Sequence, residues 1–264
     1  MDLNTYVKAE LPAFLQALQF LTRLRLAHLS VDVDADFTPE AQAASPRWYP
    51  AVGVVIGLIC GVIYWGAAVL FPPVVAVLIS TAAGLIVTGA LHEDGFADAC
   101  DGLGGVRPRE RVLEIMRDSR IGTYGVLGLG LMLATKVAAL ATLPVLVLPF
   151  VLIAGHAASR ASVLWVMASS EYVREQGAAT GVAGGLDQRA MVTGLGTAAL
   201  TMLPVLCVLP VLSVILGLAG LTAGHFAMRH RYEARLGGYT GDCLGAVQQC
   251  SEVGFYLGLL VMVA

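Results

Sequence analysis

Long apolar runs with almost no charge alternate with short polar loops along most of the chain. Several runs are close to the ~20 residues that a helix needs to cross a ~30 Å hydrocarbon core. Short breaks around proline divide them into pairs. The pattern predicts an all-α fold, a polytopic integral membrane helical bundle of about six to seven transmembrane helices. The expected spans are 50–71 with 74–91, 125–143 with 145–168, 191–208 with 211–228, and an oblique final span in 239–264.

The first 49 residues depart from this pattern. Residues 11–29 are apolar but interrupted by Gln16, Gln19, Arg23 and Arg25, which favours a helix that lies in the membrane interface or packs on the bundle over a tilted span. Residues 31–47 carry several acids and are expected to form a polar loop. Since no small-residue cleavage pattern follows the first apolar run, we expect no signal peptide. Residues 1–264 are treated as one domain.

Composition supports the membrane assignment and excludes one class of partner. Hydrophobic residues make up 57% of the chain and charged residues 13%, whereas charged residues are about 25% of typical soluble domains. The net charge of −3 provides no basic field, so no nucleic-acid partner is expected. The five cysteines show no metal-type spacing. The composition leaves a homo-oligomer open.

The distribution of basic residues predicts an orientation. Counting Arg160 as near a helix end, every Lys and Arg except Lys136 lies on the side shared by the N-terminus and the loops 92–124, 169–190 and 229–241. The positive-inside rule makes that side cytoplasmic. We therefore expect a bacterial inner-membrane protein whose active site faces the cytoplasm.

Residues 91–105, LHEDGFADACDGLGG, form the most acidic stretch of the chain. In a helix Asp94, Asp98 and Asp101 would stack on one face, and Glu93 would lie about 100° from Asp94. Stacked carboxylates repel one another, so something must neutralise them. Hard oxygen ligands favour Mg²⁺, which predicts a metal site at Glu93, Asp94, Asp98 and Asp101. The alternative is a solvated acidic helix end at the membrane surface.

Five arginines follow the acidic stretch, within a segment expected to form a short surface helix begun by Pro108. We assign Arg107, Arg109 and Arg111 to topology and lipid-phosphate contacts. Arg117 and Arg120 flank Asp118 and are the candidates for holding a diphosphate by bidentate contacts. Acids that bind Mg²⁺ beside arginines that bind phosphate predict transfer of a phosphate-linked group.

Three further roles stay open. The base for an acceptor hydroxyl is His92 or a spare carboxylate among Asp94, Asp98 and Asp101. Asp242, in a glycine-rich bend, is either a helix N-cap or a contributor to substrate binding. Lys136, inside an apolar run, either pairs with a neighbouring helix or reaches the membrane boundary.

Four segments together resemble a known family: FLTRL (20–24), HEDGFADACDGLGG (92–105), MRDSRIGTYG (116–125) and LGGYTGDCLGA (236–246). They are similar to segments of the cobalamin synthase family, the adenosylcobinamide-GDP ribazoletransferases. The resemblance implies an enzyme that joins adenosylcobinamide-GDP to α-ribazole or its 5′-phosphate. The products would be adenosylcobalamin or its 5′-phosphate, and GMP, with Mg²⁺ as cofactor.

Two rival functions are kept at this stage. The CDP-alcohol phosphotransferases also place aspartates along a helix, but Ala99-Cys100 stands here where their D-G-x-x-A-R pattern needs Ala-Arg. A cation-coupled transporter usually binds its substrate near the bilayer midplane on broken helices. The acids of this chain cluster at one end of a span beside arginines, which favours an enzyme.

Overall fold

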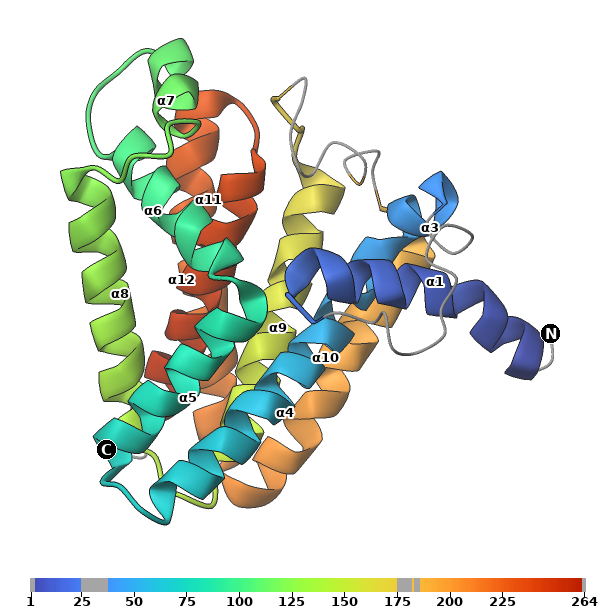
Figure 1. Cartoon of the computed structure of the whole chain (residues 1–264), viewed down its shortest axis with the longest axis vertical. Helices are drawn as coiled ribbons and strands as arrows, with labels where there is room; N and C mark the ends of the chain where they lie inside the picture. Colours follow the sequence, from blue (N-terminus) through green and yellow to red (C-terminus); the bar gives the residue numbers. More distant parts are fainter. Residues whose placement is uncertain (1–2, 25–37, 175–181, 183–185, 263–264) are drawn as a thin grey trace.

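The computed structural model describes residues 3–24, 38–174, 182 and 186–262. Within these residues the fold is a helical bundle without strands (Figure 1). The expected spans are confirmed as helices. In chain order the helices are α1 (Leu3–Leu21), α3 (Pro39–Ala44), the short 3₁₀ helix η1 (Ser45–Trp48), α4 (Tyr49–Ala68), α5 (Pro73–Thr88), α6 (Leu91–Leu103), α7 (Arg109–Ile115), α8 (Thr123–Ala141), α9 (Leu148–Ser169), α10 (Gln188–Val208), α11 (Val211–Leu236) and α12 (Gly241–Leu260).

Five helical segments of the described chain are long and apolar enough to cross a membrane: 39–68, α8, α9, α10 and α11. The helices α5 and α6 make a sixth if the bent pair counts as one span. The number therefore agrees with the lower end of the expected range. α12, predicted as an oblique seventh span, is not one of the five.

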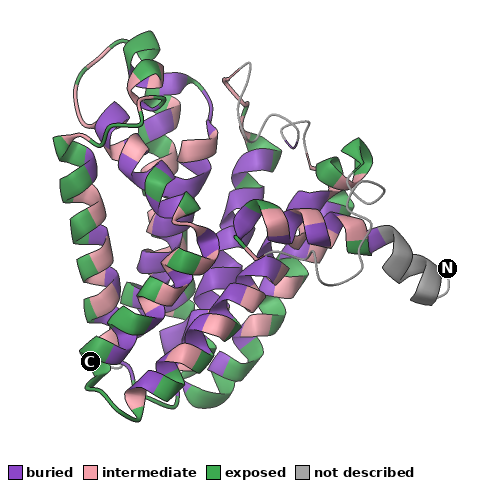
Figure 2. Ribbon diagram, in the orientation of Figure 1, coloured by how far each residue is buried: buried purple, intermediate pink, exposed green. Residues whose placement is uncertain are grey.

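α12 and α9 form the core of the bundle, and both are buried along most of their length (Figure 2). α12 packs most closely against α11, where Gly220 and Gly254 bring the two backbones together. A Cβ at either glycine would overlap the other residue's carbonyl group. Small residues allow this close approach in membrane helices. α12 therefore lies at the centre of the bundle.

Three expectations for individual segments need correction. Of the predicted polar loop 31–47, residues 31–37 lie outside the described residues, and residues 39–47 belong to helices because Thr38 caps α3 and Pro39 opens it. α1 starts at Leu3, earlier than expected, and lies across the side of the bundle against α3, η1 and α4, as one of the two predicted placements had it (Figure 1). Arg160 lies inside α9 and is 2% exposed, so it is not near a helix end.

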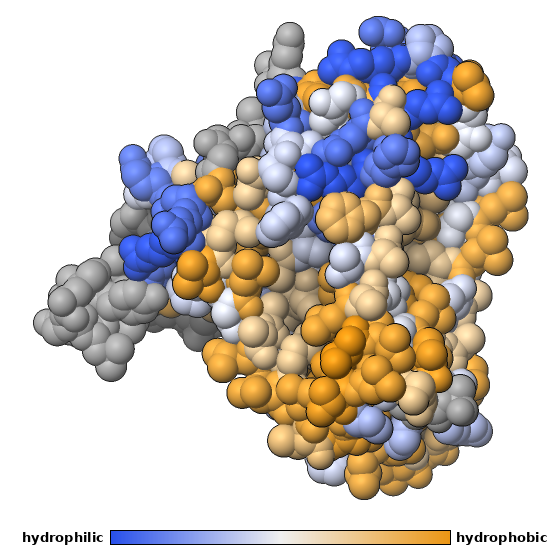
Figure 3. All heavy atoms as spheres, turned by 180° about the vertical axis from the view of Figure 1, so that it is seen from behind, coloured by the Kyte–Doolittle hydropathy of each residue, from blue (hydrophilic) through white to orange (hydrophobic). Residues whose placement is uncertain are grey.

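Hydrophilic side chains gather at one end of the molecule, and the surface below is largely apolar (Figure 3). This polar end contains the C-termini of α6, α9 and α11, the N-termini of α8 and α12, and the loops beside them (Figure 1). The hairpin tips between α4 and α5, α8 and α9, and α10 and α11 lie at the opposite end. The charged loops therefore share one end, as the sequence pattern predicted.

Candidate active site

A sharp break between α5 and α6 directs the helix that carries the acids. The two helices meet at 90°. Gly89 and Ala90 both adopt left-handed backbone conformations, with φ of 66° and 58°. The Arg23 N–H donates to the Val87 carbonyl at 2.7 Å, and the Arg23 side chain fills the space that a Cβ on Gly89 would need. The end of α1 thus braces the break from which α6 begins.

The acids of α6 lie on different faces of the helix. The helical assignment of residues 91–103 puts Asp94, Asp98 and Asp101 on one face, as predicted. Glu93 enters the interior instead, where Gln249 Nε2 donates to its Oε1 at 2.9 Å. The structure therefore separates Glu93 from the three aspartates with which the sequence grouped it.

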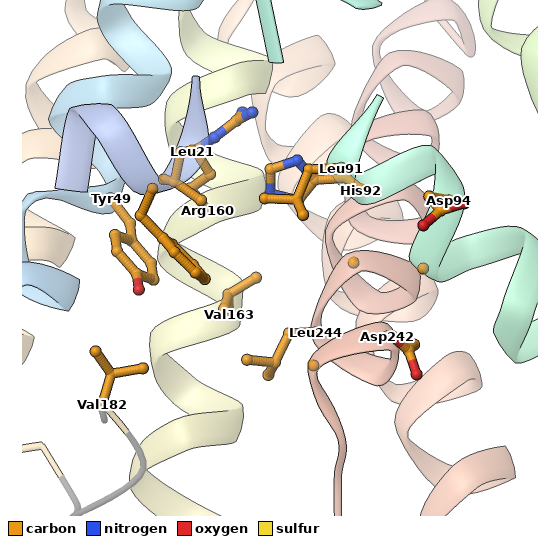
Figure 4. Close-up of a pocket in the computed structure, with 14 residues that line it drawn as sticks. Leu21, Tyr49, Leu91, His92, Asp94, Arg160, Val163, Val182, Asp242 and Leu244 are labelled. Atoms are coloured by element: carbon orange, nitrogen blue, oxygen red, sulfur yellow. The ribbon is translucent and has the colours of Figure 1, made fainter. Parts of the chain in front are cut away.

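A cavity of about 110 Å³ lies between α6, α9 and the start of α12, and we call it the α6 cavity. Its polar lining residues are His92, Asp94, Arg160 and Asp242. Apolar side chains from α1, α4, α9 and α12 make up much of the remaining wall. Asp94 and Asp242 lie at one end of the cavity, and Tyr49 and Arg160 lie toward the other (Figure 4). The cavity thus has an acidic end and a basic end within a mainly apolar wall.

Asp242 belongs to the α6 cavity and is not a helix cap. The N-cap of α12 is Thr240, whose hydroxyl accepts the Cys243 N–H at 3.3 Å, so the cap interpretation of Asp242 is wrong. Arg174 Nη2 forms an ion pair with Asp242 Oδ2 at 2.7 Å. Burial raises the pKa of the Asp242 carboxyl, and the Arg174 guanidinium opposes this shift.

Asp98 lies close enough to the other acids of the site to feel their charges. The charges of Asp242, Asp94 and Asp101 all act on its carboxylate, and Arg174 is the cation that offsets them. Three like charges against one opposite charge leave this region of α6 short of positive charge. A divalent cation would restore the balance.

Asp101 makes contacts that the sequence did not suggest. Its Oδ2 accepts the Gly122 N–H at 2.6 Å, and its Oδ1 accepts the Gly125 N–H at 2.8 Å. Both carboxylate oxygens therefore hold the N-terminus of α8. Asp101 is 8% exposed, and its carbonyl oxygen accepts from Arg107 Nη1 at 3.1 Å.

A second cavity, of about 350 Å³, opens at the polar end between α6, α7 and the start of α8. Three arginines contribute to its lining, Arg107, Arg111 and Arg120, so we call it the arginine cavity. Asp118 pairs with Arg120 at 2.6 Å, and hydrogen bonds from Arg120 lower the pKa of Asp118 to about 2. Arg117 is exposed and does not line this cavity.

A third group of charges lies in the interior of the bundle. Lys136 of α8 and Glu252 of α12 form an ion pair at 2.5 Å, which confirms that Lys136 pairs with a neighbouring helix. Glu252 also contacts His156 at 3.3 Å and accepts from Gln248 and Tyr256 at 2.6 and 3.1 Å. The sequence analysis overlooked Glu252 and Arg174 as partners. For Glu252, the sequence signal was a charged residue inside an apolar run.

The acids do not form a closed metal cage. Across the described part of the chain, no three His, Cys, Asp or Glu side chains are close enough together to hold a metal ion. Mg²⁺ does not require such a cage, because it commonly binds one or two carboxylates and takes its other ligands from water and phosphate. Asp94 and Asp98 provide hard oxygen donors of that kind, so the residues present fit Mg²⁺.

Comparison with known proteins places this geometry in a family context. The sequence profile described as cobalamin-5-phosphate synthase matches residues 13–260. The chain is 41% identical to an adenosylcobinamide-GDP ribazoletransferase from Leptothrix cholodnii, with 94% of each chain covered. It is 36% identical to one from Shewanella frigidimarina, with 96% of this chain and 95% of the relative covered. No solved structure matches the chain.

Proposed function

The chain belongs to the cobalamin-5-phosphate synthase family, and from this premise we propose that it is an adenosylcobinamide-GDP ribazoletransferase. Its substrates are adenosylcobinamide-GDP and α-ribazole or α-ribazole 5′-phosphate. A hydroxyl oxygen of the ribazole attacks the phosphorus on the corrinoid side of the diphosphate, and the bond to the GMP oxygen breaks. The products are adenosylcobalamin or its 5′-phosphate, and GMP.

The observation that carries this proposal is the group of aspartates on one face of α6, beside Asp242 and offset by Arg174. We assign Asp94 and Asp98 to holding Mg²⁺. The ion, when bound, would neutralise charge that develops on the phosphate oxygens. Asp101 is held by the start of α8 and would shape the end of this site, while Asp242 and Arg174 border it.

The proton of the attacking hydroxyl needs an acceptor near the site. His92 and Asp94 both line the α6 cavity, and His92 is 6% exposed. The apolar wall of the cavity suits a flat heteroaromatic base, and a bound base would displace water that could hydrolyse the activated donor. We assign the α6 cavity to the ribazole, with His92, which is not one of the proposed metal ligands, as the base.

We also propose that the protein resides in the inner membrane with its polar end toward the cytoplasm. The apolar helices support the membrane location, and the concentration of arginines at one end supports the orientation. The diphosphate of adenosylcobinamide-GDP is charged and would not enter the bilayer. A site at the polar end therefore meets it in water.

A GMP-release assay on the purified full chain tests the function. We expect release to require adenosylcobinamide-GDP, α-ribazole or its phosphate, and Mg²⁺ together, and to stop when a chelator removes the metal. Release without a ribazole acceptor would indicate hydrolysis instead of transfer. Absence of release with every substrate present would reject the proposal, and metal-independent release would reject the role of Mg²⁺ alone.

A further inference from the structure

The three arginines of the arginine cavity differ in how far a carboxylate neutralises them. Arg107 donates through Nη1 to the Asp101 carbonyl, which is neutral, and no carboxylate of the described chain forms a salt bridge with it. Arg111 pairs with Glu114, but both side chains are more than 60% exposed. Such exposed pairs contribute little to stability. Arg120 is the member whose charge is closely matched, by Asp118.

The carboxylate of Asp101 also lines the cavity, but within the described chain it forms no salt bridge with any of the three arginines. Its two oxygens accept the N–H groups of Gly122 and Gly125 instead. These contacts leave Thr123, in the first turn of α8, on the cavity wall, where the positive end of the helix dipole favours anions. The lining of the arginine cavity, with three arginines against Asp101 and Asp118, therefore carries a net positive charge and is open to solvent.

The position of the arginine cavity relative to the acids is also defined. Asp94 and Asp101 are seven residues apart on α6, which places them on the same face about 10 Å apart along the helix axis. Asp98 lies between them. An extended diphosphate ester can therefore have its reacting phosphate beside Asp94 and Asp98 while its other end points into the arginine cavity.

Asp101 determines the shape of the cavity through three separate contacts. Its carboxylate fixes the start of α8, and its carbonyl fixes Arg107. A Cβ on Gly122 or Gly125 would overlap the Asp101 carboxylate, so only glycine allows the helix to come this close. One residue thus connects the acidic face of α6 with two walls of the arginine cavity.

We propose that the arginine cavity binds the guanosine-side phosphate of the activated substrate through Arg107, Arg111 and Arg120, and that Asp101 is its positioning residue. This inference rests on the proposed function, because that function supplies the diphosphate. It differs from the expectation drawn from the sequence, in which Arg117 and Arg120 hold the diphosphate and Arg107 and Arg111 only face lipid. Guanidinium groups suit this role because they bind phosphate oxygens in pairs.

Lysine substitutions separate the two assignments. Arg107→Lys, Arg111→Lys and Arg120→Lys keep the charge and hence the topology, but lose the planar fork. We expect each to raise the KM for adenosylcobinamide-GDP roughly tenfold and to leave the KM for the ribazole unchanged. Arg117→Lys and Arg235→Lys, two exposed arginines outside the cavity, are the matched controls and should stay within about twofold of the parent. An effect at Arg117 with none at Arg107 and Arg111 would overturn the assignment.

Binding of inorganic pyrophosphate gives a readout that does not depend on turnover. The full chain in nanodiscs of phosphatidylcholine should bind pyrophosphate, and Arg107→Lys should weaken that binding roughly tenfold. If nanodiscs rich in phosphatidylglycerol abolish pyrophosphate binding, the cavity is a lipid-headgroup site and the proposal is wrong. If pyrophosphate binds with this arginine dependence but the parent releases no GMP, the proposed function fails and the anion site stands.

The role of Asp101 has its own test. In Asp101→Asn an amide N–H₂ replaces one oxygen and faces a backbone N–H, so one wall of the cavity shifts. We expect pyrophosphate affinity to fall by about as much as in Arg107→Lys, and the double variant to show less than the sum of the two effects. Full additivity, or loss of thermal stability with unchanged pyrophosphate affinity, would reduce Asp101 to a structural residue.

Discussion

Asp98 on α6 and Glu252 on α12 face opposite situations. Glu252 is completely buried. Its carboxylate pairs with Lys136 and His156 and accepts hydrogen bonds from Gln248 and Tyr256. Asp98 is surrounded by further carboxylates, with Arg174 as the opposing charge. A buried charge with all its partners in the protein is costly to leave unpaired and has no capacity left for a ligand. A group of acids with too few positive partners can bind a cation. The region around Glu252 therefore serves stability, and the region around Asp98 serves function.

The largest effect should come from breaking the interior group. Glu252→Ala leaves Lys136 buried without its partner, which typically costs about 3–5 kcal/mol. We expect the purified protein to melt at much lower temperature in detergent, or to fail to accumulate in the membrane. Pairing Glu252→Gln with Lys136→Met removes both charges and should restore part of the lost stability. If Glu252→Ala melts like the parent, the interior group is not a stabilising centre.

The opposite pattern is expected for the acids of the site. Asp94→Asn and Asp98→Asn should each lower the rate of GMP release about a hundredfold, because a lost hard ligand weakens both metal binding and charge neutralisation. Their melting temperatures should equal or exceed that of the parent, since each substitution relieves repulsion between carboxylates. Near-normal rates in both variants would refute the metal site, whatever their stability.

A smaller effect is expected at the break that supports α6. Ala90 adopts a left-handed conformation, which costs roughly 1–2 kcal/mol for a residue other than glycine. Ala90→Gly removes that strain but gives the unfolded chain more freedom, so we expect a gain of at most about 1 kcal/mol. Gly89→Ala is the contrasting variant, because its Cβ would overlap the Arg23 side chain. It should lower both stability and activity, and thermal melts with the GMP assay would detect a failure of either expectation.

Local patterns in the sequence were enough to predict the helices and the shared face of Asp94, Asp98 and Asp101. Apolar run length fixes a membrane helix, and the 3.6-residue repeat fixes which side chains share a face. These local rules could not predict which side chains from distant segments contact one another. Glu93 and Gln249 are separated by 156 residues, and only packing of α6 against α12 reveals their hydrogen bond.

The N-cap of α12 and the arginines after α6 show the same limit at shorter range. Thr240 and Asp242 both suit an N-cap by residue type, and the backbone geometry selects Thr240. Arg107 and Arg117 are both arginines in a polar loop, but the turn of the chain after α6 puts Arg107 on the cavity wall and Arg117 outside it. Residue type narrows the candidates, and the path of the chain decides among them.

The arrangement around Glu252 also constrains how this protein can evolve. Lys136 and His156 come from two helices, and Gln248 and Tyr256 come from the same helix as Glu252. A single substitution at any one of these positions leaves a partner unsatisfied in an apolar interior. Lineages can therefore change this group only through coupled replacements. Among descendants of a common ancestor, positions 136, 156 and 252 should vary together or remain fixed together.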